Sequence, residues 1–399
     1  MKIEKINTKI IKNSRGEDTI EVELSFGSGE SGIASVPQGA STGEREAISL
    51  LAEDAISKIN GVIVPALSEK NFENQDEFDD YLCEIDGTEN KSRLGGNSIL
   101  ALSLAFARAN AKRQNKELFQ YIADIAHTTP SLPRFFMNLV NGGKHGTNNL
   151  NFQEYMIVVG AESAKRQLEV GNQIFSELKK TIKKNDFKLA YGDEGGLNID
   201  FENHEKPLEV LTNIIKNSEP KEGVGLALDV AADSFYKKEN NLYEVDGRLT
   251  SVAELIDIYK NLLNKYNVIS IEDPFEENQF QDYATLKNSL QNTIIVGDDL
   301  TTTNEIYIKK AIESNSINGL IVKPNQIGTL TETLEAIKIA HENNIKCIIS
   351  HRSGDTMDDF IADLAYGVGA YGLKSGAPEP KERMVKYNRI INIEKNINC

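Results

Sequence analysis

Three short apolar runs between residues 268 and 328 each end abruptly in polar residues. The first run is followed by Glu272, the second by Asp298 and the third by Lys323. The runs are rich in β-branched residues and do not alternate with polar ones, which is typical of parallel strands buried on both faces. Helix-length segments separate them. The pattern therefore predicts strand–helix units with charged side chains at the carboxyl ends of the strands, the end where barrels of such units carry their sites.

The spacing of these charges extends the pattern along the chain. The separations from Glu272 through Asp298, Lys323 and His351 to Lys374 are 26, 25, 28 and 23 residues, about the length of one strand, one helix and two loops. Asp229 follows another apolar run 43 residues before Glu272, which corresponds to one unit plus an insertion. One such side chain alone is better explained as a helix cap. Six in register favour a functional site.

The N-terminal part has a different pattern. Residues 1–35 predict two or three strands, and the alternation at 19–24 is typical of a half-exposed antiparallel strand. Residues 46–123 have helical spacing, and the apolar, small-residue run at 98–107 predicts a buried helix packed on the first sheet. The small residues at 37–43 indicate a loop, either a plain connector or a mobile one.

A proline-containing linker at 127–133 marks the expected domain boundary. We therefore expect an α+β domain at 1–127 and an α/β barrel domain at 134–399. The barrel starts irregularly: strands are expected at 134–140 and 155–159, a long helix at 163–184, and then a strand leading to the glycine-rich segment 192–196. The predicted fold class is α/β, a modified (β/α)8 barrel with a smaller N-terminal domain.

Composition narrows the possible functions. Of 399 residues, 40% are hydrophobic, enough for a sizeable core, and the net charge of −16 argues against nucleic acid or an anionic membrane as the main partner. Three widely spaced cysteines favour a reducing compartment without a disulfide framework. No signal peptide and no run of about 20 apolar residues is found, so we expect a cytoplasmic protein without a membrane span.

Three carboxylates from three strand ends, Asp229, Glu272 and Asp298, would repel one another if they were buried together without a counter-charge. A divalent cation resolves this cost. An all-oxygen ligand set favours a hard ion and points to Mg²⁺, since the Cys and His ligands typical of zinc are missing from the set.

The two strand-end lysines, Lys323 and Lys374, have two possible roles. A lysine beside a bound divalent ion and a second lysine loses its proton more readily, which would leave a neutral amine as a base. Alternatively, both are ordinary partners of the carboxylates.

Candidate acids and anion-binding groups complete the set. Glu154 and Glu194 are candidate acids, and the glycines around Glu194 allow close approach to a ligand. His351, Arg352 and Ser353 form a candidate anion clamp, because arginine makes forked hydrogen bonds to phosphate or carboxylate. A loop histidine such as His145 is more often structural or solvated than functional. Together these groups suit abstraction of a proton next to a carboxylate, followed by acid-assisted loss of a hydroxyl.

The motifs also support a resemblance. The chain resembles the enolase family over nearly its whole length, in Gly39-Ala40-Ser41-Thr42-Gly43, Gly192-Asp193-Glu194-Gly195-Gly196, Ser270-Ile271-Glu272-Asp273-Pro274, Asn325-Gln326-Ile327-Gly328, Ser350-His351-Arg352-Ser353-Gly354 and Lys374-Ser375-Gly376, among other segments. A lysine base combined with Mg²⁺ is the established arrangement of the enolase superfamily.

The resemblance implies a Mg²⁺-dependent conversion of 2-phosphoglycerate to phosphoenolpyruvate by a homodimer. It implies that Asp229, Glu272 and Asp298 bind the first Mg²⁺ and that Ser41 contributes to a second one that arrives with substrate. By the same resemblance, Lys323 is the base and Glu194 the acid, with Glu154 assisting. The remaining implied roles are phosphate binding by Arg352 and Ser353, carboxylate binding by Lys374, and completion of the pocket by His145, Gln153 and His351.

Departures from the family pattern leave alternatives open. Gln38 replaces the usual serine, a stretch after Ala47 is missing, and Asp233-Ser234 replaces Ser-Glu. One alternative is a divergent paralogue that abstracts a proton from another phosphorylated or phosphonylated carboxylate. A second is a non-catalytic binding protein on the same scaffold, although retention of both lysines and both glutamates argues against it.

Overall fold

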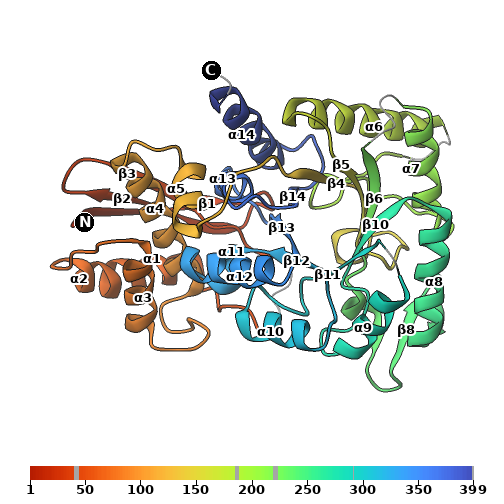
Figure 1. Ribbon diagram of the computed structural model, residues 1–399, viewed down its shortest axis with the longest axis horizontal. Helices are drawn as coiled ribbons and strands as arrows, with labels where there is room; N and C mark the ends of the chain where they lie inside the picture. The colour runs from red at the N-terminus through yellow and green to blue at the C-terminus, as the bar shows by residue number, and fades with distance from the viewer. Residues whose placement is uncertain (40–44, 185–187, 219–222, 291, 398–399) are drawn as a thin grey trace.

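An antiparallel sheet and the helices covering it form the N-terminal part of the molecule (Figure 1). The computed structural model describes residues 1–39, 45–184, 188–218, 223–290 and 292–397. The sheet has the order β1 (Ile3–Lys12), β2 (Asp18–Phe26), β3 (Ser31–Ser35). The helices that follow are α1 (Ala52–Lys58), α2 (Val64–Leu67), α3 (Gln75–Asp86), α4 (Gly96–Arg113) and α5 (Leu118–Ala126).

The buried helix predicted at 98–107 is confirmed as the centre of α4. Its alanines and serines are buried along almost its whole length, and it packs on β2 and β3. Small residues allow this close packing: a Cβ placed on Gly32 of β3 would lie 1.9 Å from the carbonyl oxygen of Ala105. Ile20, Val22 and Leu24 of β2 are fully buried, as expected for the apolar face of an alternating strand.

The predicted helical start at residue 46 is wrong, because the first helix begins at Ala52. The backbone of residues 47–48 is bonded to other segments instead of to a helical turn. The Ala47 N–H donates to Gln326 O (2.8 Å), and Ile48 bonds to both Asn90 and Gly96. Periodicity does not reveal such long-range backbone bonds.

The C-terminal part is a closed barrel, which confirms the predicted fold class. Around the ring the strand order is β10-β11-β12-β13-β14-β4-β5-β6. Strand β5 is antiparallel to both of its neighbours, and the other pairs are parallel. The bounds are β4 (Arg134–Asn141), β5 (Glu154–Val159), β6 (Val224–Asp229), β10 (Val268–Glu272), β11 (Ile294–Gly297), β12 (Gly319–Val322), β13 (Lys346–Ser350) and β14 (Gly372–Lys374).

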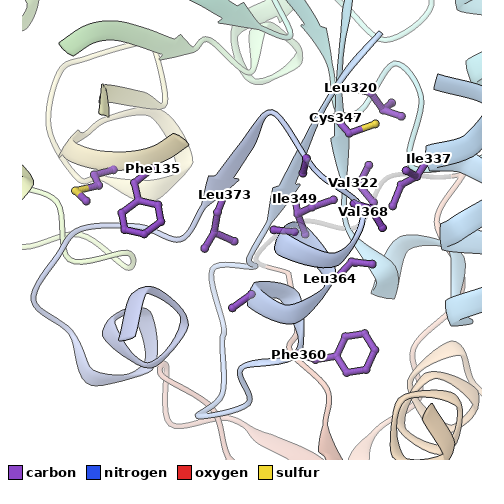
Figure 2. Close-up of a cluster of buried hydrophobic side chains, with 14 of the residues drawn as sticks. Phe135, Leu320, Val322, Ile337, Cys347, Ile349, Phe360, Leu364, Val368 and Leu373 are labelled. Atoms are coloured by element: carbon purple, nitrogen blue, oxygen red, sulfur yellow. The ribbon is translucent and has the colours of Figure 1, made fainter. Parts of the chain in front are cut away.

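Helices surround the barrel and bury its outer face. They are α6 (Ala164–Lys184), α7 (Lys206–Lys216), α8 (Val252–Lys265), α9 (Phe280–Ser289), α10 (Glu305–Glu313), α11 (Pro324–Ile327), α12 (Leu330–Glu342), α13 (Phe360–Gly367) and α14 (Lys381–Ile397). Figure 2 shows the packing of this layer, where Leu320, Val322 and Ile349 of the strands face Ile337 and Leu364 of the helices and Val368 just after α13.

The inside of the barrel is filled as well, by a separate apolar cluster that includes Phe136, Met156, Val296 and Ile348. A filled interior leaves the mouth of the barrel, where the parallel strands end, as the place for chemistry.

Of two predicted details of the barrel, the structure shows one and not the other. The insertion predicted before Glu272 is present as a small sheet of β7 (Tyr236–Lys237), β8 (Leu242–Val245) and β9 (Arg248–Thr250). The strand predicted before Gly192 is wrong for the residues described there: 188–191 form no strand, and Tyr191 makes only an isolated bridge to Leu197. The glycines that follow favour a turn over an extended ladder.

The division at residues 127–134 stays a prediction.

None of the helices among the described residues is long and apolar enough to cross a membrane. Cys83 and Cys347 are free thiols.

Candidate active site

A polar cavity at the mouth of the barrel brings together most of the residues predicted from sequence. It is lined by His145, Gln153, Glu154, Glu194, Asp229, Asp298, Lys323, His351, Arg352, Ser353 and Lys374. Glu272 joins them through its contact with Lys374 (2.8 Å). Ser41 and the rest of 40–44 lie outside the described residues.

Lys374 lies among three carboxylates. Its Nζ donates to Asp229 Oδ2 (2.9 Å) and Glu272 Oε2 (2.8 Å), and lies 3.3 Å from Glu154 Oε2. Burial favours the neutral amine, but Asp229, Glu154 and Glu272 outweigh it and raise the pKa of Lys374 well above its usual value. Of the two roles considered for Lys374, its surroundings therefore match that of an ordinary partner of the carboxylates.

Lys323 is positioned by a sharp turn after β12. Pro324 occupies the first position of α11, so the strand ends at Val322 and Lys323 lies at the mouth. Its Nζ forms an ion pair with Asp298. Burial, Arg352 and Lys374 act to lower the pKa of Lys323, but Asp298 and Glu272 outweigh them and raise it in the protein alone. The lowered pKa expected beside a bound divalent ion stays a prediction.

Asp273 supports the turn that presents Asp298. Its carboxylate accepts hydrogen bonds from the backbone N–H of Asp298 (3.0 Å) and Asp299 (2.8 Å) and from the Tyr283 hydroxyl (3.0 Å). The backbone of Asp273 itself has φ = 42°, a strained region for a non-glycine residue. Asp273, Asp298 and Asp299 each place one oxygen within 4.8 Å of the others. The three hydrogen bonds that Asp273 accepts give it a supporting role in the turn that presents Asp298.

The carboxylates fit a divalent cation. Burial and the neighbouring Asp229 raise the pKa of Glu272 well above its usual value, and burial with Asp298 raises the pKa of Asp299 to about 7. Within the part of the chain that the structure describes, Glu272 Oε1 is buried without a hydrogen-bond donor. An oxygen-only set with excess negative charge and an unbonded carboxylate oxygen is what a hard cation requires.

A second cluster is formed by Glu194 with Glu154, His145 and Asn138. His145 Nδ1 lies 3.3 Å from Glu154 and 3.5 Å from Glu194, and Glu194 also accepts from Asn138 (3.0 Å). Burial and Glu194 raise the pKa of Glu154 to about 7. Burial acts on Glu194 in the same direction, but His351 and His145 outweigh it and keep the pKa of Glu194 well below its usual value. Two adjacent carboxyls with separated pKa values can exchange a proton near neutral pH.

Arg352 has a buried partner that sequence reasoning missed. Its guanidinium donates to Glu46 Oε2 (2.9 Å) and Oε1 (3.3 Å), and to Asn325 Oδ1 (3.1 Å). Glu46 is only 3% exposed. Glu46 had been assigned to the start of a helix from its sequence, so it was not considered as a partner of Arg352. A glutamate beside a small-residue loop gives no local indication of such a partner.

Comparison with known families agrees with the geometry. Residues 3–122 match the model described as "Enolase, N-terminal domain", and residues 129–399 match "Enolase, C-terminal TIM barrel domain".

Full-length relatives give the same result. An enolase of Ureaplasma parvum serovar 3 is 41% identical over 425 residues, covering 100% of this chain and 97% of the relative. Enolases of Sulfurisphaera tokodaii and Metallosphaera sedula are 42% and 41% identical, covering 99% and 96% of this chain and 96% and 94% of their own lengths. With both domains matched and full-length relatives well above 30% identity, the chain belongs to the enolase family.

Proposed function

We propose that the mouth of the barrel catalyses the reversible dehydration of 2-phosphoglycerate to phosphoenolpyruvate, a step of glycolysis and gluconeogenesis. As a member of the enolase family, the chain is a phosphopyruvate hydratase, a carbon–oxygen lyase. The observation that carries the residue-level proposal is the meeting of Lys323 and the Glu154–His145–Glu194 cluster around strand-end carboxylates in one buried mouth.

In this proposal Lys323 takes the proton from C2, and Glu194 delivers to the departing C3 hydroxyl a proton that it receives from Glu154, the carboxyl with the raised pKa. Arg352 and Ser353 bind the phosphate, while Lys374 binds the substrate carboxylate. His145, Gln153 and His351 complete the pocket. The carboxylates and cations provide fixed charges at the reacting atoms, and their burial limits the access of bulk water.

Asp229, Glu272 and Asp298 would hold one Mg²⁺, and Ser41 would contribute to a second. When bound, Mg²⁺ supplies positive charge for the extra negative charge that develops on the substrate carboxylate as C2 loses its proton. The unbonded Glu272 Oε1 and the raised pKa of Glu272 support this ligand set.

We also propose a cytoplasmic homodimer. The support is the family resemblance and, for the compartment, the free thiols of Cys83 and Cys347. Light scattering at micromolar concentration should give twice the chain mass of 44.2 kDa, and a monomeric mass would contradict the dimer.

The central test is an assay of the purified protein with Mg²⁺ and 2-phosphoglycerate. Phosphoenolpyruvate should form, visible as a rise in ultraviolet absorbance, and a chelator should stop its formation. A folded, Mg²⁺-binding protein that forms no phosphoenolpyruvate would contradict the proposal. Turnover of a different phosphorylated or phosphonylated carboxylate would then favour a divergent paralogue, and binding without turnover would favour a binding protein.

A further inference from the structure

Arg383 is a fully buried arginine that the proposed chemistry does not use. It lies on α14 with 0% of its surface exposed. Its Nη1 lies 2.7 Å from His351 Nδ1 and donates to the carbonyl oxygen of Arg352 (2.6 Å). Its Nη2 donates to the carbonyl oxygens of Ser353 (2.6 Å) and Asp193 (3.2 Å). A C-terminal helix thus contacts both the anion-clamp loop and the segment next to Glu194.

The contact with His351 determines where the imidazole carries its proton. A guanidinium has only donors, so His351 Nδ1 must be the acceptor and cannot carry a hydrogen. The proton of a neutral ring is then on Nε2. That nitrogen lies 3.4 Å from Glu194 Oε1. The Arg383 contact therefore selects the tautomer with its proton on Nε2, the nitrogen beside Glu194, although Nε2 makes no hydrogen bond among the residues that the structure describes.

The ring is also kept neutral. Burial lowers the pKa of His351 to about 4, and Arg383 acts in the same direction. The groups that oppose this are the carboxylates Glu194 and Asp355. Asp355 is itself paired with Lys386 (3.0 Å) and lies 3.4 Å from Arg383. A doubly protonated ring would direct an N–H at the guanidinium, which has no acceptor to receive it.

We propose that Arg383 is a positioning residue, which fixes His351 in the Nε2–H tautomer and thereby holds an N–H beside Glu194, the proposed acid. The inference rests on the proposed role of Glu194. The hydrogen bond from Arg383 to Asp193 O adds a second constraint, because it holds the backbone immediately before Glu194. Arg383 acts through His351 and the backbone and does not touch the reacting atoms.

The test needs a readout that loss of packing alone would not change. The chain has five histidines, so ¹⁵N-labelled histidine gives a simple spectrum, and His351→Gln identifies the His351 signals by their disappearance. The wild-type protein should show Nδ1 unprotonated and Nε2 protonated from about pH 5.5 to 8.5, a range in which a free imidazole titrates. A wild-type ring with its proton on Nδ1, or one that titrates in this range, overturns the proposal.

Two variants separate positioning from packing. Arg383→Met removes every donor at similar size, and Arg383→Lys keeps a charged donor. In Arg383→Met we expect loss of the single tautomer and a fall in kcat of about 10- to 100-fold, the size expected from one lost hydrogen bond to a charged group, with a smaller change in KM. Arg383→Lys should recover much of both. An unchanged tautomer in folded Arg383→Met overturns the proposal.

If Arg383→Met does not fold, as judged by circular dichroism, the wild-type spectrum and Arg383→Lys still decide the question. A wild-type protein that has the expected tautomer but no hydratase activity counts against the proposed function instead, so the two failures are distinguishable.

Discussion

Three buried cations at the mouth of the barrel are each paired with a carboxylate: Lys323, Lys374 and Arg352. Lys374 contacts Asp229 and Glu272, and Lys323 contacts Asp298. Burying such charges costs several kcal/mol for each ion unless the partners are close and well oriented. The two charges of each pair therefore offset the cost of burying one another. A substrate or metal can bind by taking the place of one partner in a pair.

Lys323→Ala tests the base directly. We expect exchange of the C2 proton of 2-phosphoglycerate with solvent to fall by about 10²- to 10⁴-fold, the usual contribution of a general base. Mg²⁺ binding should survive, because the substitution removes a positive charge from Asp298. Isotope exchange followed by NMR, together with Mg²⁺ titration, measures both.

Lys309→Ala is the matched control, since Lys309 lies exposed on α10 and pairs with Glu305 on the surface. Proton exchange that persists in Lys323→Ala at the rate of this control would show that another group is the base.

The packing of α4 on the N-terminal sheet depends on a glycine at one contact. A Cβ on Gly32 would lie 1.9 Å from Ala105 O and 2.7 Å from Ala109 N, both backbone atoms of α4. Backbone atoms in a buried helix cannot move aside as a flexible side-chain end can. The closeness of β3 and α4 is therefore possible only without a side chain at position 32.

Gly32→Ala should lower the free energy of unfolding by about 3 kcal/mol, at the upper end of typical overpacking costs. Urea unfolding followed by circular dichroism measures it. Gly27→Ala provides the comparison, because a Cβ there meets no atom within 4 Å. Equal stability of the two variants would contradict the packing argument.

At the scale of the whole molecule, a buried polar network joins the N-terminal helices to the start of α12. Asp79 of α3 accepts hydrogen bonds from Gln75 (3.0 Å) and from the backbone N–H (3.0 Å) and hydroxyl (2.7 Å) of Thr331. Ser103 of α4 accepts from the Leu330 N–H (2.9 Å). These bonds satisfy the first N–H groups of α12, which follows closely after Lys323.

This network makes stability depend on pH. Burial outweighs the hydrogen bonds from Thr331 and raises the pKa of Asp79 from 3.8 to about 6. Because the pKa is higher in the folded state, the ionised group costs stability. The cost is absent below about pH 4, grows between pH 4 and 6, and reaches about 3 kcal/mol above that.

Asp79→Asn should remove this dependence. Its unfolding free energy relative to wild type should rise by about 3 kcal/mol between pH 4 and 7, measured by urea unfolding at several pH values. Asp80→Asn, an exposed neighbour on the same helix, should follow the wild-type curve. Parallel curves for Asp79→Asn and wild type would contradict the raised pKa.

The sequence predicted the periodic parts of this molecule well. Asp229, Glu272, Asp298, Lys323 and Lys374 were found because parallel strands repeat at a regular interval and end at one mouth. Glu46 and Arg383 were not found. Glu46 contacts Arg352 across about 300 residues of chain, and Arg383 contacts His351 across about 30. Contacts of this kind do not appear in the periodicity of a sequence. Spacing also did not reveal the pairing of Lys323 with Asp298, which raises the pKa of Lys323 in the protein alone.

The order of strands around the ring determines the sides from which a bound substrate is approached. Strands β12 and β5 are four steps apart in either direction, so they face each other across the barrel. Lys323 follows β12, whereas Glu154 begins β5 and lies in one cluster with Glu194. With the proposed roles, the proton and the hydroxyl leave the substrate from opposite faces. The stereochemical course is then an anti elimination, and hydration in the reverse direction adds water across the same two faces.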